Sequence, residues 1–428
     1  MRTTNYALGL LCTAMAFAAD PAAGWKPWAP RPEIAPRTYL DPLVARTSTG
    51  SLAVSGNSNS AAYGGWERSV PVEPGRWYRF SSYYKPENLT YERGQVLAIL
   101  DWQTAAGTRS GFPEFAARTK GDGLWRRMVA EAPAPPDARS VKLQLFLSNA
   151  PQGVVWWDGI SFEAIPAPAP RPVTVVSLNL RPEGSQTSAQ SVEQFAQLAE
   201  KVAPPKTDII VLPEGVTVVG TRFSDAEVGE AVPGPTTARL GELARKTGAY
   251  VVAGLYERVG SAVYNTAVLI DRRGQLAGKY RKVYLPREEF EGGLTPGTDY
   301  PVFETDFGKV GMMICWDVQY ADPARALALR GAELILLPIW GGNTTLAKAR
   351  AIENQVFLAA SGYDFPTQIL DPLGAVIAEA PQRGTAAIAT IDLNRRYVQD
   401  WLGNMRPRFR QEIRLDVPVL PRANDDNE

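Results

Sequence analysis

The stretch from Val310 to Asp317 reads VGMMICWD, and the organisation of the chain can be worked out from it. An apolar run leads into Cys315, and the Trp-Asp pair that follows marks a change from a strand pattern to a helix pattern. A thiol at the end of a buried strand can point into a pocket while the strand holds its position. Free cysteine is also a common core residue, so Cys315 alone does not indicate chemistry.

Two charged residues follow apolar strand patterns upstream of Cys315. Glu214 comes after the segment DIIVLP, and Lys282 lies on the second arm of a hairpin that we predict around residues 272–274. Taken singly, each is an ordinary surface charge. Together they place a carboxylate, an ammonium and a thiol after strands at one edge of a sheet, where α/β folds assemble their sites.

Composition limits the chemistry that this site can use. The chain has 428 residues, enough for two domains, and it contains no histidine. This excludes histidine-based triads and nearly all zinc sites, so acid–base chemistry must use carboxylates, Lys, Tyr or Cys. Lys plus Arg equals Asp plus Glu at 45 each, so no net field indicates nucleic acid or an anionic membrane. We expect no metal, no cofactor and no nucleic-acid partner.

The N-terminus has the pattern of a secretory signal peptide over residues 1–19. Arg2 supplies the positive region, residues 6–19 the apolar region, and the triplet AFA at 16–18 a cleavage site. The apolar run is too short to span a bilayer, so we expect export to the periplasm or the cell exterior and no membrane span. Cleavage would remove Cys12 and leave Cys315 unpaired in a compartment that permits disulfides. Catalysis is one explanation for such a lone thiol.

Residues 25–165 show short alternating strands with many aromatic residues and turn signals, which predicts an all-β sandwich. The phrases PGRWYRFSSYYK (74–85) and GVVWWDGISFE (153–163) resemble the galactose-binding-like jelly-roll modules found beside secreted enzymes. The resemblance leaves two roles open for this domain, carbohydrate binding and structural support.

The proline-rich run at 166–172 predicts a stiff extended linker. Beyond it, over 173–402, long apolar strands alternate with helices such as the one expected at 188–202, and antiparallel hairpins are interspersed. This pattern predicts a mixed sheet layered with helices. Residues 403–428 are expected to form a C-terminal tail that ends in frayed polar residues.

The second domain resembles the nitrilase, or carbon–nitrogen hydrolase, superfamily. Its motifs are IIVLPEG around Glu214, KYRKVYLP around Lys282 and GMMICWD around Cys315, with support from RAIENQ, TPG and DPLG. Three motifs in the family's order make a strong signal, whereas any one would be weak. The resemblance implies an α-β-β-α sandwich. The whole chain is therefore expected to be a multidomain α/β (α+β) protein, with a β-sandwich jelly roll followed by a nitrilase-like domain.

The resemblance also implies an amidase-type hydrolase that cleaves a non-peptide amide with a Glu–Lys–Cys triad. Glu214 would take the thiol proton and Cys315 would attack the carbonyl carbon to form a thioester. Lys282 and the backbone N–H of Trp316 would stabilise the oxyanion.

Members of the superfamily carry a second glutamate between the lysine and the cysteine. In REEFEGGLTPG (287–297), the spacing to TPG favours Glu291, with Glu289 as the alternative, and either could be a surface charge. Further residues near strand ends are candidates to line the substrate pocket, namely Asp317, Gln319, Trp340 and Asn343.

Three functions stay open at this point. The first is hydrolysis, the second is acyl transfer in which an amine resolves the same thioester, and the third is a secreted glycan-binding protein with an inactive hydrolase-like domain. The expected partners are a small amide, a carbohydrate at the N-terminal domain and a second copy of the chain. The sequence does not name the amide.

Overall fold

The computed structural model describes residues 15–16, 22–47 and 50–417. The chain divides into two compact units, the first comprising residues up to Pro168 together with the segment from Val398 onward, and the second running from Ala169 to Tyr397. Apart from 15–16, the predicted signal peptide lies outside the described residues. Within the described ranges, no helix combines the length and the apolar character that crossing a membrane requires.

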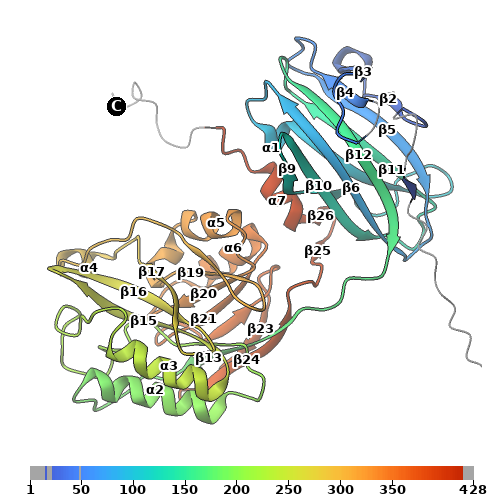
Figure 1. The fold of residues 1–428 in the computed structure, drawn as a ribbon. Helices are drawn as coiled ribbons and strands as arrows, with labels where there is room; N and C mark the ends of the chain where they lie inside the picture. Colours follow the sequence, from blue (N-terminus) through green and yellow to red (C-terminus); the bar gives the residue numbers. More distant parts are fainter. Residues whose placement is uncertain (1–14, 17–21, 48–49, 418–428) are drawn as a thin grey trace, which may run out of the picture. The chain divides into compact units, whose positions relative to one another are not determined.

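The first unit contains two antiparallel sheets (Figure 1), and buried apolar side chains of both form one core. The seven-stranded sheet pairs β1 (Met15–Ala16) with β12 and has the order β3 (Arg37–Asp41), β4 (Ser51–Ser55), β12 (Val154–Ile165), β6 (Trp77–Glu87), β10 (Trp125–Pro133), β9 (Ala117–Asp122). The five-stranded sheet has the order β2 (Lys26–Trp28), β5 (Tyr63–Pro71), β11 (Ser140–Ser148), β7 (Val96–Gln103), β8 (Glu114–Phe115). Large buried side chains such as Phe80, Trp102 and Trp157 belong to one core cluster, as expected for alternating strands.

The chain returns to this first unit after it has built the second. A hairpin of β25 (Val398–Gln399) and β26 (Gly403–Asn404) leads into α7 (Met405–Glu412), which contacts α1 (Glu92–Gln95). Nε2 of Gln411 donates a hydrogen bond to the Val96 carbonyl at 3.4 Å. The predicted tail at 403–428 therefore begins with β26 and α7, and 418–428 lie outside the described residues.

The second unit contains two mixed six-stranded sheets, each with three parallel strands at its centre. The first sheet has the order β17 (Leu276–Arg281), β16 (Ala262–Ile270), β15 (Tyr250–Val259), β14 (Ile209–Val211), β13 (Pro172–Asn179), β24 (Thr385–Asp392). The second has the order β18 (Val302–Glu304), β19 (Lys309–Met312), β20 (Leu334–Pro338), β21 (Phe357–Ser361), β22 (Gln368–Leu370), β23 (Val376–Glu379).

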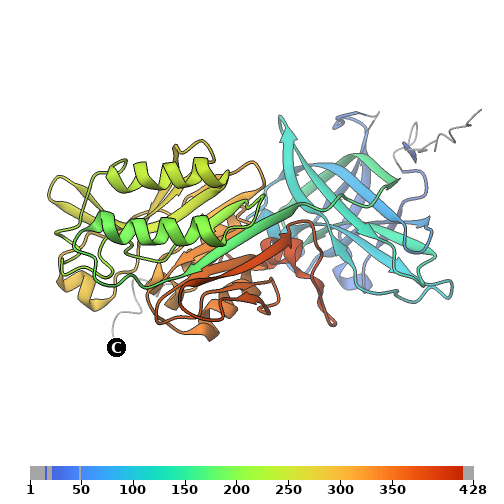
Figure 2. The ribbon, with the colours of Figure 1, turned by 90° about the horizontal axis from the view of Figure 1, so that it is seen from below.

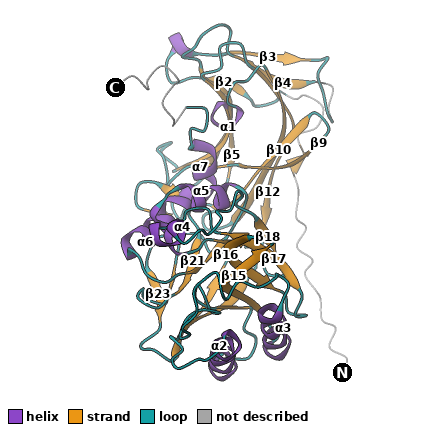
Figure 3. Cartoon of the chain, turned by 90° about the vertical axis from the view of Figure 1, so that its left-hand side faces the viewer, coloured by secondary structure: helices purple, strands orange, loops and turns teal. Residues whose placement is uncertain are grey.

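Helices cover the outer faces of the two sheets. The helices α2 (Ser188–Val202) and α3 (Pro235–Thr247) lie side by side on the first sheet (Figures 1 and 2). The helices α5 (Asp322–Leu329) and α6 (Thr344–Asn354) contact the second, so the strands lie between the two pairs (Figure 3). Strands β13, β14 and β15 of one sheet contact β20 and β21 of the other. This is the α-β-β-α sandwich that the resemblance implied.

Local signals explain where the helices begin and end. The predicted helix at 188–202 is confirmed: Oγ1 of Thr187 accepts a hydrogen bond from the backbone N–H of Gln190, and two prolines follow the C-terminus. Helix α3 ends at Gly248, whose φ of 67° is the left-handed conformation that glycine adopts without strain. The buried faces of both helices pack on the apolar strands of the first sheet.

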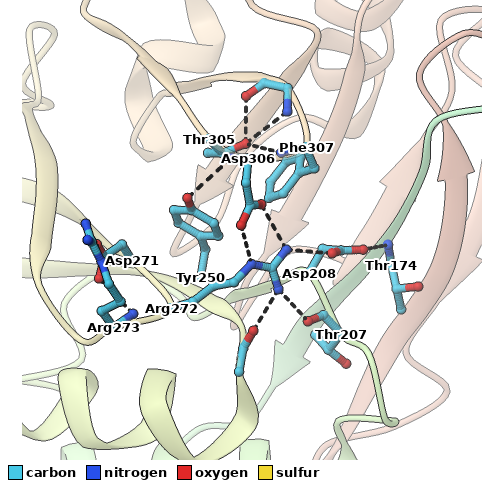
Figure 4. Close-up of polar contacts among 12 residues, drawn as sticks. Thr174, Thr207, Asp208, Tyr250, Asp271, Arg272, Arg273, Thr305, Asp306 and Phe307 are labelled. Atoms are coloured by element: carbon cyan, nitrogen blue, oxygen red, sulfur yellow. Dashed lines mark hydrogen bonds and ion pairs between the residues drawn. The ribbon is translucent and has the colours of Figure 1, made fainter.

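An arginine in the turn between β16 and β17 connects the two sheets (Figure 4). Nη2 of Arg272 lies 2.7 Å from Asp208, the residue before β14, and Nε lies 2.8 Å from Asp306, in the turn that leads into β19. The same guanidinium donates to the Gly248 carbonyl at 2.7 Å. Arg272 therefore fixes the starts of two strands, and the far ends of these strands lead to Glu214 and Cys315.

Candidate active site

A cavity of about 820 Å³ opens in the second unit, and Glu214, Lys282 and Cys315 all line it. The three residues that the sequence predicted to act together therefore face one space. The cavity is also lined by other charged and aromatic side chains, among them Arg181, Phe223, Asp225, Tyr256, Glu288, Glu289, Trp316 and Trp340. In the part of the chain that the structure describes, no group of three or more Cys, Asp or Glu side chains is arranged to hold a metal ion.

Glu214 is positioned by its backbone. It lies three residues past β14, where the N–H of Gly254 donates to the Pro213 carbonyl at 3.0 Å. A Cβ atom at position 254 would come within 2.8 Å of the Glu214 Cα, so this close approach requires glycine. The Tyr363 hydroxyl donates to the Glu214 carbonyl at 2.8 Å. The carboxylate is almost fully buried, and one of its oxygens, Oε2, has no hydrogen-bond partner among the described residues.

Lys282 directly follows β17 and is fully buried. Its backbone N–H donates to the Asn265 carbonyl at 2.8 Å. Its carbonyl accepts from the N–H of Gly297 at 2.7 Å, so the TPG motif helps to hold Lys282 in position. Its Nζ lies 2.9 Å from Oε1 of Glu214 and 2.7 Å from Oε1 of Glu289. Burial lowers the pKa of Lys282, but the neighbouring Glu214, Cys315 and Glu289 raise it further than burial lowers it. The ammonium is therefore charged at neutral pH.

Asn265, on β16, connects the two glutamates. Its Nδ2 donates to Oε1 of Glu214 at 2.7 Å and to Oε1 of Glu289 at 2.9 Å, and the residue is fully buried. This neutral donor gives one hydrogen bond to each carboxylate without adding charge to the cavity. The sequence analysis missed Asn265, although a polar residue inside the apolar strand YNTAVLID was a usable signal, because a buried amide needs partners.

Cys315 begins a short 3₁₀ helix (Cys315–Gln319) three residues after β19 ends. Its φ is +41°, a strained value for a non-glycine residue and one that concentrates at functional sites. The sharp turn presents the sulfur to the cavity, where the thiol donates to the Gly341 carbonyl at 3.5 Å. Burial, together with the Glu214 charge, raises the pKa of Cys315 to about 12. The sulfur therefore rests as a thiol at neutral pH.

The choice of Glu291 as the second glutamate is corrected by the structure. Glu291 lies at the surface, where its carboxylate pairs with Arg287 at 2.7 Å. Glu289 instead lines the cavity and contacts Lys282. Both residues belong to the short helix α4 (Arg287–Glu291), in which residues two apart point to nearly opposite sides. Burial raises the pKa of Glu289 to about 7, although contact with Lys282 opposes the rise.

Asp317 does not line the substrate pocket as predicted, because its carboxylate is turned inward and fully buried. It accepts hydrogen bonds from the Tyr280 hydroxyl at 2.7 Å, from the Ile314 N–H at 2.9 Å and from the Tyr284 N–H at 3.0 Å. Burial raises the pKa of Asp317 to about 6 against the lowering effect of these donors. Asp317 holds the turn that carries Cys315.

Of the remaining pocket candidates, Trp340 lines the cavity, whereas Gln319 and Asn343 do not. Trp316, whose backbone N–H was predicted to support the oxyanion, also lines the cavity. Gln319 offers its backbone carbonyl to Arg350 at 3.1 Å, so α6 supports the 3₁₀ helix from behind. Oδ1 of Asn343 accepts from the Thr345 N–H at 2.9 Å and caps α6. These two residues support the site from outside it.

Comparisons with known proteins show the family of the second unit. Residues 173–401, more than half of the chain, match the family model described as carbon-nitrogen hydrolase. The chain is similar to the omega-amidase NIT2 of Xenopus tropicalis, at 30% identity over 270 residues that cover 56% of this chain and 92% of the relative. A probable nitrilase of Schizosaccharomyces pombe is 34% identical over 216 residues, covering 44% of this chain and 77% of the relative.

Among solved structures, Saccharomyces cerevisiae Nit3 of the nitrilase superfamily is 23% identical, with a TM-score of 0.47 over 58% of this chain and 96% of that one. The family is shown by the match to the family model and by the similarity to the omega-amidase. The chain belongs to the carbon–nitrogen hydrolase family and is an amidase-like hydrolase of carbon–nitrogen bonds other than peptide bonds.

Proposed function

We propose that this hydrolase cleaves a small amide through a thioester on Cys315, with Glu214 as general base and Lys282 as the oxyanion partner. One observation supports this most strongly. A buried ammonium lies 2.9 Å from a buried carboxylate, and both line the cavity into which the only thiol of the described residues opens. These are the three kinds of group that an acyl transfer through sulfur requires.

The first half-reaction forms the thioester. Because the pKa of Cys315 is raised to about 12, the thiol needs a base, and Glu214 takes its proton as the sulfur attacks the carbonyl carbon. The negative charge that develops on the carbonyl oxygen is stabilised by the ammonium of Lys282 and by the backbone N–H of Trp316. Glu214 then gives its proton to the leaving nitrogen, the carbon–nitrogen bond breaks, and ammonia or an amine departs.

The second half-reaction releases the acid. Glu214 takes a proton from water, the hydroxide oxygen bonds to the thioester carbon, and the carbon–sulfur bond breaks. The proton held on Glu214 returns to the sulfur, so the enzyme ends as it began and one water has been consumed. Glu289 and Asn265 hold Lys282 and Glu214 in place during both steps through their hydrogen bonds.

The experiment measures ammonia release from small aliphatic amides by Cys315→Ala, Glu214→Gln and Lys282→Met, each compared with the unaltered chain. We expect each variant to lose at least about a thousandfold in kcat/KM, which is the scale on which removing a nucleophile or a base acts. Circular dichroism shows whether each variant is folded. A folded Cys315→Ala protein with full activity would end the proposal. Adding an amine tests acyl transfer, because an N-acylated product would identify transfer in place of hydrolysis.

For the first unit we propose a galactose-binding-like jelly roll. Its pairing supports this: β4 lies beside β12, β5 beside β11, β6 beside β10 and β7 beside β8, so the chain runs as one long hairpin wrapped across two sheets. A crystal structure of the full chain tests it, and sheets built from successive neighbouring hairpins would contradict it.

We also propose that the chain is exported, on the strength of the charged, apolar and small-residue pattern at its N-terminus. N-terminal sequencing of the protein recovered from its native cells tests this. A mature chain that begins just after residue 18 or 19 supports export, and a chain that keeps the apolar region contradicts it.

A further inference from the structure

The cavity carries more negative than positive charge. Its lining includes two cationic side chains, Arg181 and Lys282, and four carboxylates, Glu214, Asp225, Glu288 and Glu289. Both cations already have acidic partners. Lys282 contacts Glu214 and Glu289, and Arg181 pairs with Asp364 at 2.7 Å while lying over the Trp340 ring. Among the described residues, no ion pair involves Asp225 or Glu288.

Asp225 is the more enclosed of these two carboxylates. It is partly buried at the cavity wall; burial raises the pKa of Asp225, and the neighbouring hydroxyl of Tyr256, a side chain that is only 4% exposed, acts in the opposite direction. A carboxylate can accept about four hydrogen bonds, so one neutral neighbour leaves most of its capacity unused. Removing a charge from water without a compensating partner costs free energy. A ligand in the cavity that carries a positive charge would offset part of this free-energy cost.

The remaining walls suit an alkyl chain. The side chains of Phe223, Trp316 and Trp340 line the same cavity, and its volume of about 820 Å³ is within the range of small-molecule sites. The aromatic rings can contact methylene groups and can also attract a nearby cation through their faces. The cavity therefore offers a nucleophile, apolar walls and an uncompensated carboxylate.

We propose that the substrate is an amide that carries a protonated amino group on a short alkyl chain, and that Asp225 binds this ammonium, with Glu288 adding negative charge nearby. This inference rests on the proposed function, because the amide must reach Cys315. A substrate with a free carboxylate is disfavoured by the same charges, since both cations of the lining already have acidic partners.

Three amides with the same four-methylene chain test the inference. They are 5-aminopentanamide, which ends in an ammonium, hexanamide, which ends in a methyl group, and adipic acid monoamide, which ends in a carboxylate. We expect kcat/KM at pH 7.5 to be at least about tenfold higher for the ammonium compound than for hexanamide, and lowest for the carboxylate. Equal values for the ammonium and methyl compounds, or a preference for the carboxylate, would overturn the inference.

Substitutions test which carboxylates are responsible for the preference for the ammonium compound. In Asp225→Asn the ratio of kcat/KM between 5-aminopentanamide and hexanamide should fall about tenfold, and in Glu288→Gln, which alters an exposed side chain, it should fall about two- to threefold. Glu291→Gln is the matched control, because Glu291 lies outside the cavity, and its ratio should not change. An unchanged ratio in both Asp225→Asn and Glu288→Gln overturns the assignment, and Glu288→Gln keeps the test valid should Asp225→Asn fail to fold.

Failure of the two proposals can be told apart. If hexanamide or the carboxylate compound is hydrolysed through Cys315 without a preference for the ammonium, the substrate inference alone is wrong. If the unaltered chain hydrolyses these amides and a folded Cys315→Ala protein hydrolyses them equally fast, the proposed function is wrong, and the substrate inference falls with it.

Discussion

Nδ2 of Asn265 lies 2.7 Å from Oε1 of Glu214. The same nitrogen lies 2.9 Å from Glu289, so one neutral side chain holds both carboxylates that contact Lys282. Because Asn265 is fully buried, its amide keeps this geometry independently of solvent. The hydrogen bond from Asn265 lowers the pKa of Glu289 against the effect of burial and so favours the ionised form of that carboxylate.

Replacing Asn265 with alanine should lower kcat/KM about ten- to a hundredfold, because Glu214 loses a donor and Glu289 becomes harder to ionise. The midpoint of the acid limb of the pH–rate profile should also move to higher pH. Steady-state kinetics from pH 5 to 9 measure both effects. Thr266→Val is the matched control, because Thr266 is buried on the same strand but donates to Glu257. An unchanged pH profile in Asn265→Ala would contradict this role.

The pair Glu289 and Glu291 offers a direct comparison within one short helix. Glu289→Gln should lower kcat at least about tenfold, since the carboxylate 2.7 Å from Nζ of Lys282 loses its charge. Glu291→Gln should keep kcat within about twofold, because its exposed ion pair with Arg287 contributes little. Ammonia release at saturating substrate gives both values. The reverse result, with Glu291 essential and Glu289 dispensable, would contradict the site as described.

Stability should depend on pH through Glu289. Its pKa is raised from 4.5 to about 7 on folding, so between these values the folded chain holds a proton that the unfolded chain has lost. The contribution of this group to stability is therefore present below about pH 4.5 and is lost as the pH rises to 7, at about 1.4 kcal/mol per pH unit.

Calorimetry at pH 5 and pH 8 tests this. The Tm of Glu289→Gln minus that of the unaltered chain should be more positive at pH 8, because glutamine carries no charge to bury. Glu291→Gln should give the same difference at both pH values. A Glu289→Gln difference that is more negative at pH 8 than at pH 5 would show that the sign is wrong.

Arg272 should matter for stability. Arg272→Ala removes contacts to Asp208, Asp306 and the Gly248 carbonyl, and we expect a loss of about 1–3 kcal/mol in the free energy of unfolding. Arg273→Ala changes the neighbouring arginine, whose side chain is 85% exposed, and should cost less than about 0.5 kcal/mol. Urea unfolding of the two variants gives both values, and equal losses would contradict the role of Arg272 in connecting the sheets.

The sequence predicted the parts of the site that follow buried strands. Glu214 and Cys315 each come after an apolar run, and Lys282 follows the second arm of the predicted hairpin, so the ends of these strands could be expected to lie together. The helix at 188–202 was also predictable, because Thr187 and the following prolines are local signals.

The predictions that were wrong concern residues whose side-chain direction depends on the local backbone conformation. A spacing of two places Glu289 and Glu291 on different sides of α4, but it does not reveal which side faces the cavity. Spacing also does not reveal that Asp317 turns inward to accept from Ile314. Asn343 was a foreseeable cap, because asparagine directly before a helical pattern commonly accepts from the first turn. Asp225 follows no buried strand and offered no such signal.

The most direct test of the central claim is mass spectrometry of the acid-quenched enzyme during turnover of a small amide. The account predicts that the peptide containing Cys315 gains the mass of the acyl group, that hydroxylamine removes this mass, and that Cys315→Ala shows no adduct while remaining folded. Turnover by the unaltered chain with no acyl group on that peptide at any time in the pre-steady state, or an equal adduct in Cys315→Ala, would contradict the account.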